Sequence, residues 1–134
     1  MENKVNIRVR YQETDQMGVV YHGNYLTWFE IGRSEMTRSM GLTYADMEAM
    51  GVMMPVTFAN LQYKAPARYD DELTIVTEVV KVSPVRMEFA YQVLRGQEIL
   101  AEGSTGHAFI AQDGKPIRLD KACPSAWSII KQVR

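Results

Sequence analysis

The residues best suited to chemistry lie in one glycine-containing loop near the start of the chain. Asp15 stands several residues ahead of a predicted helix start, and Gly18 and Gly23 allow the backbone between them to turn sharply. The first N–H groups of a helix have no partner within the helix and carry partial positive charge. Such groups can stabilise an oxyanion, while a carboxylate beside them can attack an acyl carbon or activate a water. The pattern is therefore suited to hydrolysing an ester or thioester held between the two.

Other reactive side chains have simpler explanations. His22 is either structural or an acid–base group, whereas His107 falls in a predicted strand and is expected to be structural. Glu30 precedes Arg33 by three residues on the polar side of the predicted helix, which predicts an intrahelical ion pair and leaves Glu30 as a reserve base. Cys123 has no nearby histidine, so a nucleophilic thiol is not expected. Two histidines without spaced acidic partners do not predict a metal site.

Aromatic and sulfur-containing side chains could shape a pocket near this loop. Tyr21 and Tyr25 are expected to pack or to line a pocket, because an ordinary phenol stays protonated near neutral pH. Four methionines cluster in the sequence, namely Met47, Met50, Met53 and Met54. Because thioether side chains adapt to irregular space, this cluster fits either core filling or a pliable acyl pocket. The sequence leaves both interpretations open.

A long helix must follow the loop and position its end. Apolar side chains recur every three or four residues between Tyr25 and Met40, and Gly41 stands where helices commonly end. Asn24 is expected to cap the helix start. Gly32 lies on the apolar stripe, which predicts a close approach to another element.

Two shorter helices are predicted further along the chain. Thr43 can cap a helix over residues 44–50, and Gly51 can end it. Residues 124–133 are expected to form a closing helix with Pro124 in its first turn.

Alternating apolar and polar residues predict five strands. The expected strands are residues 5–11, 52–63, 73–82, 87–93 and 99–112. A change of phase within the second strand predicts a bulge near Ala59 and Asn60. Short connections force antiparallel pairing, and the long helix must cover one face, which gives an α+β layered architecture. A second copy of the chain is the simplest cover for the remaining apolar face and the sheet edges.

Composition narrows the class of protein. The 134 residues predict one domain, 1–134. The net charge is -1, so no overall positive charge attracts nucleic acid or an anionic membrane. No run reaches the ~18 apolar residues of a membrane span, and residues 1–10 lack a secretory apolar region. One cysteine cannot form an intrachain disulfide, which fits a reducing compartment. We therefore expect a cytoplasmic protein without nucleic acid partners or stable membrane insertion.

The loop and helix start resemble the bacterial 4-hydroxybenzoyl-CoA thioesterase family of hotdog proteins. The family pattern Asp-x-x-Gly-x-Val-x-x-x-x-Tyr occurs here as Asp15, Gly18, Val20 and Tyr25. The extension His-Gly-Asn-Tyr at residues 22–25, followed by Phe29-Glu30 and Arg33, resembles the branch of short-chain acyl-CoA thioesterases associated with the Tol–Pal system. The later strand order and residues 69–73 extend the resemblance over most of the remaining chain.

The resemblance implies both a fold and a site. It implies the hotdog fold, in which a five-stranded antiparallel sheet wraps around one long helix, with two subunits pairing edge to edge and an active site at their interface. Asp15 matches the catalytic carboxylate, acting as nucleophile or general base. His22 matches the residue whose backbone N–H polarises the thioester carbonyl, and Tyr21, Gly23 and Tyr25 are expected to bind the substrate. No metal is implied, and no cofactor beyond the CoA of the substrate.

The resemblance also places CoA along the surface, with its phosphates held by basic and hydroxyl side chains of the partner subunit. Candidates for these contacts are Lys64, Arg68, Ser83, Arg86, Lys115 and Arg118. The family enzyme for hydroxybenzoyl-CoA carries a basic cluster after its second long strand. This chain departs from that pattern, with Ser-Pro-Val-Arg at residues 83–86.

We therefore expect an enzyme of lipid metabolism that hydrolyses a small or medium acyl-CoA to the free acid and CoA. Two alternatives stay open. One is a thioesterase for acyl carrier protein substrates, and the other is an acyl-CoA binding or scaffold protein without turnover. The expected assembly is a homodimer or a dimer of dimers, the latter a homotetramer.

Overall fold

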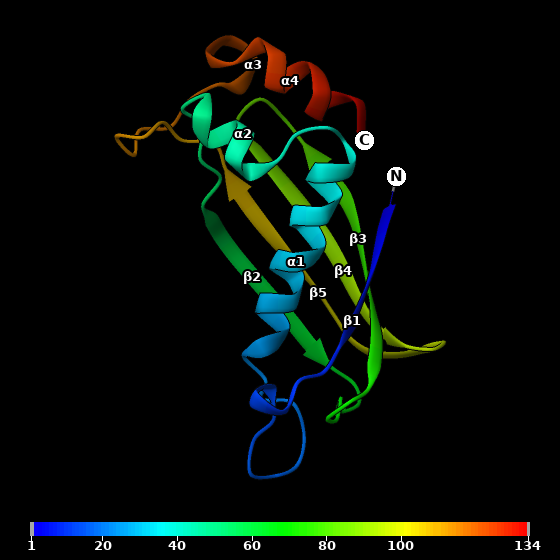
Figure 1. The fold of residues 1–134 in the computed structure, drawn as a ribbon. Coiled ribbons are helices and arrows are strands. Elements are labelled where there is room, and N and C mark those ends of the chain that lie inside the picture. Colours follow the sequence, from blue (N-terminus) through cyan, green and yellow to red (C-terminus); the bar gives the residue numbers. More distant parts are fainter. Residues whose placement is uncertain (1, 134) are drawn as a thin grey trace.

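The computed structural model of this chain describes residues 2–133, and these form one sheet with one long helix across it (Figure 1). The strands are β1 (Glu2–Arg8), β2 (Val56–Tyr63), β3 (Glu72–Val82), β4 (Arg86–Arg95) and β5 (Glu98–Ala108). The helices are α1 (Asn24–Ser39), α2 (Tyr44–Ala49), α3 (Leu119–Ala122) and α4 (Pro124–Ile130), with 3-10 turns η1 (Tyr11–Glu13) and η2 (Lys131–Val133). Within residues 2–133, no helix is long and apolar enough to cross a membrane.

The five strands form one antiparallel sheet in the order β1-β3-β4-β5-β2. This confirms the expected α+β hotdog architecture, with the sheet curving around α1 (Figure 1). The strand β2 lies at one edge of the sheet and pairs only with β5 among the described elements. One long edge of β2 therefore presents backbone N–H and C=O groups without a strand partner in this chain.

The helix α1 presses its apolar face against the sheet. Trp28, Phe29 and Met36 are fully buried, and the ring of Phe29 stacks on Tyr91 of β4 at a centroid distance of 4.2 Å. A Cβ added at Gly32 would collide with the hydroxyl of Thr77 on β3. The predicted close approach at Gly32 is therefore confirmed, and it fixes the depth at which α1 lies on the sheet.

The predicted second helix is confirmed at its start. Thr43 accepts a hydrogen bond from the Asp46 N–H at 3.0 Å, and the Asp46 carboxylate accepts one from the Thr43 N–H at 2.9 Å. The closing helix is α4 followed by η2, with Pro124 in its first turn. The short helix α3 before it was not predicted from the sequence.

Several expectations about the strands were wrong in detail. The second strand begins at Val56 rather than at residue 52, and only an isolated bridge at Met53 precedes it. The first strand ends at Arg8 because the chain turns there into η1, and the last strand ends at Ala108. The bulge in β2 lies between Val56 and Phe58 rather than near Ala59 and Asn60. The ring of Phe58 occupies the space that a side chain at Gly106 would fill. We attribute the position of the bulge to this contact, since it fixes the register from Phe58 onward.

A chain of buried polar groups crosses the sheet beneath α1. The Tyr91 hydroxyl lies 2.6 Å from the Thr105 hydroxyl, which lies 2.8 Å from Nε2 of His107, while Nδ1 of His107 lies 3.2 Å from the Met54 carbonyl. Because a carbonyl only accepts, we assign the imidazole hydrogen to Nδ1, so that Nε2 accepts from Thr105. Burial, reinforced by the positive charge of Arg33, lowers the pKa of His107 to about 4 despite the bond to Met54. His107 is therefore neutral near pH 7 and ties β5 to the segment before β2.

Candidate active site

The loop that carries Asp15 is a compact turn between η1 and α1. Thr14 and Val20 form an isolated bridge, and the Asp15 N–H donates to the Val19 carbonyl at 2.9 Å. One carboxylate oxygen of Asp15 accepts from the Met17 N–H at 2.9 Å. The second carboxylate oxygen makes no hydrogen bond with residues 2–133, so the carboxylate is held in place while one oxygen stays available.

Glu13 fastens this loop to α1, a role that the sequence did not reveal. Its buried carboxylate accepts from the Trp28 indole at 2.9 Å and from the Arg10 N–H at 2.8 Å. Burial alone would raise the pKa of Glu13, but these bonds and the Arg10 guanidinium outweigh it and lower the pKa. The Glu13 carbonyl also accepts from the Tyr21 N–H and from the Asn24 side chain. Glu13 therefore fixes both ends of the Asp15 loop.

The start of α1 differs from the expectation in one respect. Gly23 is the N-cap residue, and Asn24 is the first helical residue, because its side chain is already engaged by the Glu13 carbonyl. Within residues 2–133, the backbone N–H groups of His22 and Gly23 donate no hydrogen bond. A Cβ at Gly23 would lie 2.9 Å from the Tyr21 ring, so a glycine here lets that ring pack closely on the backbone. These two N–H groups are free to bind a carbonyl oxygen.

A cavity of about 330 Å³ joins the Asp15 loop to the far end of β2. Its lining residues are Asp15, Met17, Val19, Val20, His22, Tyr25, Tyr63, Lys64, Ala65 and Pro66. Tyr63 donates its hydroxyl hydrogen to the His22 carbonyl at 2.9 Å, and its ring meets Tyr25 edge-on at 5.1 Å. The cavity therefore brings Asp15 and residues at the start of α1 to one space.

Of the other residues predicted to bind substrate, some line the Asp15 cavity or lie near it, and others lie outside it. Lys64 lines the Asp15 cavity, where it pairs with Glu102 at 3.1 Å, and Arg68 follows shortly after it. Tyr21 is exposed and its ring packs on His22 at 4.4 Å, outside the cavity lining. Tyr25 is buried, and its hydroxyl accepts from the Ala67 N–H at 3.3 Å.

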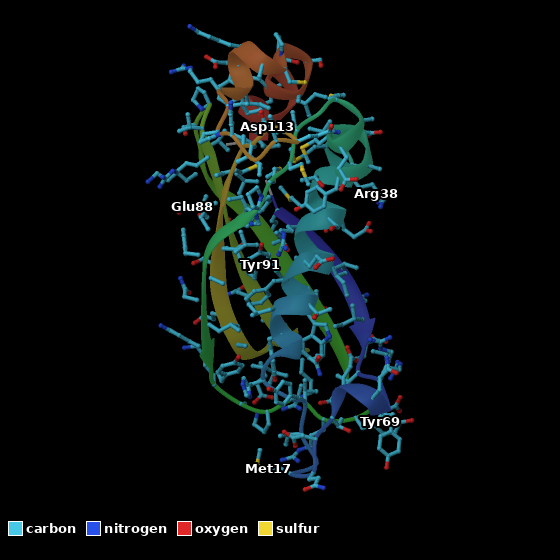
Figure 2. All side chains as sticks on the ribbon, turned by 90° about the vertical axis from the view of Figure 1, so that its left-hand side faces the viewer. Met17, Arg38, Tyr69, Glu88, Tyr91 and Asp113 are labelled. Carbon is cyan, nitrogen blue, oxygen red and sulfur yellow. The ribbon has the colours of Figure 1, made fainter. Side chains whose placement is uncertain are left out.

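Ser83 and Arg86 lie at the opposite end of the molecule from Asp15 in the same chain. The N–H of Val20 donates to Ala67, just before β3, whereas Ser83 follows the other end of that strand. Eleven residues of β3 separate the two places by roughly 35 Å. Figure 2 shows the same separation, with Met17 of the Asp15 loop at one end and Asp113, close in sequence to Lys115 and Arg118, at the other. These four residues can reach a ligand at Asp15 only from another copy of the chain.

The predicted ion pair between Glu30 and Arg33 was wrong, since their charged groups form no ion pair within 4.0 Å in the described chain. Glu30 is exposed, whereas Arg33 is half-buried with an enclosed Nε, and its charge acts on the phenols of Tyr44 and Tyr91. The helix pair that does form is Glu35 with Arg38, at 3.5 Å.

Known proteins share this fold. A family model described as the thioesterase superfamily matches residues 17–102, well over half of the chain. This chain belongs to the thioesterase superfamily. The Bacillus subtilis protein YneP is 36% identical over 124 residues, covering 91% of this chain and 90% of YneP. The acyl-CoA thioester hydrolase YbgC of Escherichia coli O6:H1 is 34% identical over 94 residues, covering 70% of each chain.

A solved structure agrees closely with this one. The DHNA-CoA thioesterase from Staphylococcus aureus superposes with a TM-score of 0.94 at 40% identity, covering 98% of this chain and 90% of that protein. Because the superposition covers almost the whole chain, it takes in the loop, the helix start and the sheet together. The chain therefore shares the hotdog fold of this relative over almost all of its given length.

Proposed function

We propose that this chain hydrolyses the thioester of an acyl-CoA, releasing a free acid and CoA. The observation that carries the proposal is one cavity lined by both Asp15 and His22, beside which the backbone N–H groups of His22 and Gly23 donate no hydrogen bond within residues 2–133. Membership of the thioesterase superfamily and the names of the relatives support the same reaction.

The geometry suggests how the reaction proceeds. The thioester carbonyl oxygen accepts hydrogen bonds from the N–H groups of His22 and Gly23, where the positive end of α1 stabilises the negative charge that develops. Asp15 either attacks the carbonyl carbon or removes a proton from an attacking water. In both routes the C–S bond breaks, water supplies the second carboxylate oxygen, and the CoA sulfur leaves and takes up a proton. The ring of His22, held between Tyr21 and Tyr63, orients the substrate.

A homodimer is part of the proposal. The exposed edge of β2 carries the apolar side chains Val56, Phe58 and Tyr63, each more than two-fifths exposed. An unpaired edge of this length in a stable protein needs a cover, and a second β2 supplies matching hydrogen bonds. Two such dimers could assemble further into a tetramer.

Contacts to CoA follow from the same dimer. We propose that Lys64 and Arg68 of the chain that supplies Asp15 hold CoA phosphates beside the cavity. The second copy supplies side chains from its opposite end, and these are Ser83, Arg86, Lys115 and Arg118. The two arginines and the lysine among them carry charged ends on long flexible stems, which suits a solvated diphosphate.

The identity of the acyl group is the part of the substrate that the proposal leaves to experiment. The Staphylococcus aureus relative is named for DHNA-CoA, which makes a bicyclic aromatic acyl-CoA the first compound to test beside straight-chain acyl-CoAs. The His-Gly-Asn-Tyr motif at residues 22–25 supports a place in the 4-hydroxybenzoyl-CoA thioesterase family near the Tol–Pal-associated branch. Action in the cytoplasm on lipid intermediates, without a metal or further cofactor, belongs to the same proposal. Hydrolysis of acyl carrier protein thioesters and binding without turnover are the alternatives.

Release of free thiol from a panel of acyl-CoAs tests the reaction. Asp15→Asn should lower kcat at least about 100-fold, because the amide cannot act as nucleophile or base. Asp113→Asn is a matched control, since Asp113 accepts from the Lys115 N–H at 3.0 Å in the same kind of turn that Asp15 makes with Met17. Near-wild-type turnover by Asp15→Asn would refute the assignment of Asp15. Faster release from matched acyl carrier protein substrates would favour the first alternative, and tight binding without release would favour the second.

A further inference from the structure

The two N–H groups that the proposed reaction uses belong to successive peptide groups at the start of α1. The His22 N–H shares a peptide group with the carbonyl of Tyr21, and the Gly23 N–H shares one with the carbonyl of His22. Because a peptide group is planar, whatever holds its carbonyl also fixes the direction of its N–H. The partners of these two carbonyls therefore decide where the two donors point.

The helix holds the first of these peptide groups better than the second. The Tyr21 carbonyl accepts from the Asn24 N–H at 3.0 Å, which is an ordinary length. The His22 carbonyl accepts from the Tyr25 N–H at 3.4 Å. This second bond is longer than the usual upper limit of about 3.2 Å. Left to α1 alone, the Gly23 N–H is less firmly oriented than the His22 N–H.

Tyr63, the last residue of β2, supplies a stronger bond to the second peptide group. Its hydroxyl donates to the His22 carbonyl at 2.9 Å from 41 residues further along the chain. Because a carbonyl only accepts, the hydroxyl hydrogen must point at it. Partial burial, reinforced by the nearby phenol of Tyr21, raises the pKa of Tyr63 above its usual value. The hydroxyl therefore keeps this hydrogen throughout the neutral pH range.

The side chain of Tyr63 is itself held by its neighbours. Its backbone pairs with Ala101 of β5, and its ring meets the buried ring of Tyr25 edge-on at 5.1 Å. The Tyr25 hydroxyl in turn accepts from the Ala67 N–H at 3.3 Å, in the segment that follows β2. The bond to His22 therefore ties the start of α1 to the sheet, which is more rigid than the Asp15 loop.

We infer that Tyr63 is a positioning residue for thioester hydrolysis, because its hydroxyl orients and polarises the peptide group that carries the Gly23 N–H. This inference rests on the proposed thioesterase function and deepens it. A hydrogen bond accepted by an amide carbonyl strengthens the bond that the same amide donates. The oxyanion carries more negative charge than the carbonyl oxygen of the substrate, so the gain is larger in the transition state. Tyr63 thus acts on the reaction through the peptide group of His22 and Gly23.

Removal of one hydroxyl group tests this role. Tyr63→Phe keeps the ring against Tyr25 and deletes the donor to His22. The value of kcat should fall about tenfold while KM changes by less than about twofold, because the lost effect is realised in the transition state. The expected loss is smaller than the roughly 100-fold cost of deleting a whole oxyanion donor, because the Gly23 N–H itself remains.

Tyr69→Phe is the matched control. Tyr69 is 57% exposed, against 48% for Tyr63, and no hydrogen bond within residues 2–133 involves its hydroxyl. Its ring packs on Tyr11, away from the residues that line the Asp15 cavity. Loss of this hydroxyl should leave both kcat and KM unchanged.

The stretching frequency of the bound thioester carbonyl separates positioning from a merely structural role. An acyl-CoA with an isotopic label at the carbonyl carbon is expected to stay bound to Asp15→Asn without hydrolysis, so infrared difference spectra report the strength of the donors. Adding Tyr63→Phe should reduce the shift that binding produces by roughly 10–30%, and adding Tyr69→Phe should not change it. A ring-fluorinated tyrosine in place of Tyr63 is a more acidic donor of nearly the same size. It should enlarge the shift, and it serves as the second variant if Tyr63→Phe does not fold.

The outcomes separate the inference from the function beneath it. Near-wild-type kcat in Tyr63→Phe, or a raised KM alone, would overturn the inference. A lowered kcat without any change in the carbonyl frequency would overturn it as well, since the loss would then arise elsewhere in the site. A wild-type protein that releases no thiol from any acyl-CoA would refute the proposed function, and the inference would fall with it.

Discussion

Acid should destabilise this protein through His107 in a pH window set by its burial. In the folded chain the pKa of His107 falls from the ordinary 6.5 to about 4, first because of burial and then because of the charge on Arg33. Between those values the unfolded chain binds a proton that the folded chain does not, so stability rises with pH. The contribution of His107 is complete above pH 6.5 and is lost as the pH falls toward 4.

The size of this loss follows from the two pKa values. One unit of pKa difference corresponds to about 1.36 kcal/mol, so the full loss has an upper limit of roughly 3.4 kcal/mol, of which about 2 kcal/mol is lost by pH 5. On protonation Nε2 becomes a donor, so its hydrogen bond with the Thr105 hydroxyl must reverse direction. The hydrogen bonds of residues 2–133 offer this N–H no other acceptor. These values apply at fixed protein concentration, because dimer formation shifts apparent stability.

Urea denaturation at pH 5 to 7.5 measures the effect. His107→Gln cannot titrate, so its free energy of unfolding should be lower at pH 7.5 but should fall less steeply toward pH 5 than that of the wild type. The difference between the two slopes isolates His107 from the carboxylates, which titrate in both proteins. Equal slopes, or an NMR titration of the His107 ring with a pKa near 6.5, would refute the reasoning.

Two further predictions concern the supports of the site. Glu13→Gln should lower the free energy of unfolding by about 1–3 kcal/mol, because the amide has one oxygen where the carboxylate has two, so either the Trp28 indole or the Arg10 N–H loses its acceptor. Glu48→Gln on the surface should change it by less than about 0.5 kcal/mol. Equal urea midpoints for both variants would contradict this role. Gly32→Ala should cost about 1–3 kcal/mol despite the better helix propensity of alanine, because the new methyl collides with the Thr77 hydroxyl. Adding Thr77→Ala should restore most of this loss, and strict additivity in the double variant would argue against the collision.

The sequence predicted those features that depend on neighbouring residues. Hydrophobic spacing revealed α1 and the strands, since each pattern repeats within a few residues. Thr43 predicted the start of α2 because a cap acts on residues only three positions away. The spacing of Asp15, Gly18 and Gly23 identified the loop for the same reason.

Features that depend on distant contacts escaped the sequence. The cavity beside Asp15 needs Tyr63 and Pro66 from the end of β2, and no local pattern says which strand end meets the loop. Glu13 looks like any loop acid until the indole of Trp28 encloses it. The bulge in β2 is misplaced from sequence because its position follows the contact of Phe58 with Gly106 on another strand. The charge on Arg33 likewise turns inward to phenols supplied by other elements.

The bond between Trp28 and Glu13 gives the molecule a built-in optical probe. Trp28 is 1% exposed, and its indole N–H is bound to the carboxylate that fastens the Asp15 loop. Any event that lifts the loop from α1 must break this bond and admit water to the indole. The emission of Trp28, read in a Trp127→Phe background, would then move to longer wavelength. Stopped-flow fluorescence could therefore time the movement of the loop during a single encounter with substrate, with no added label.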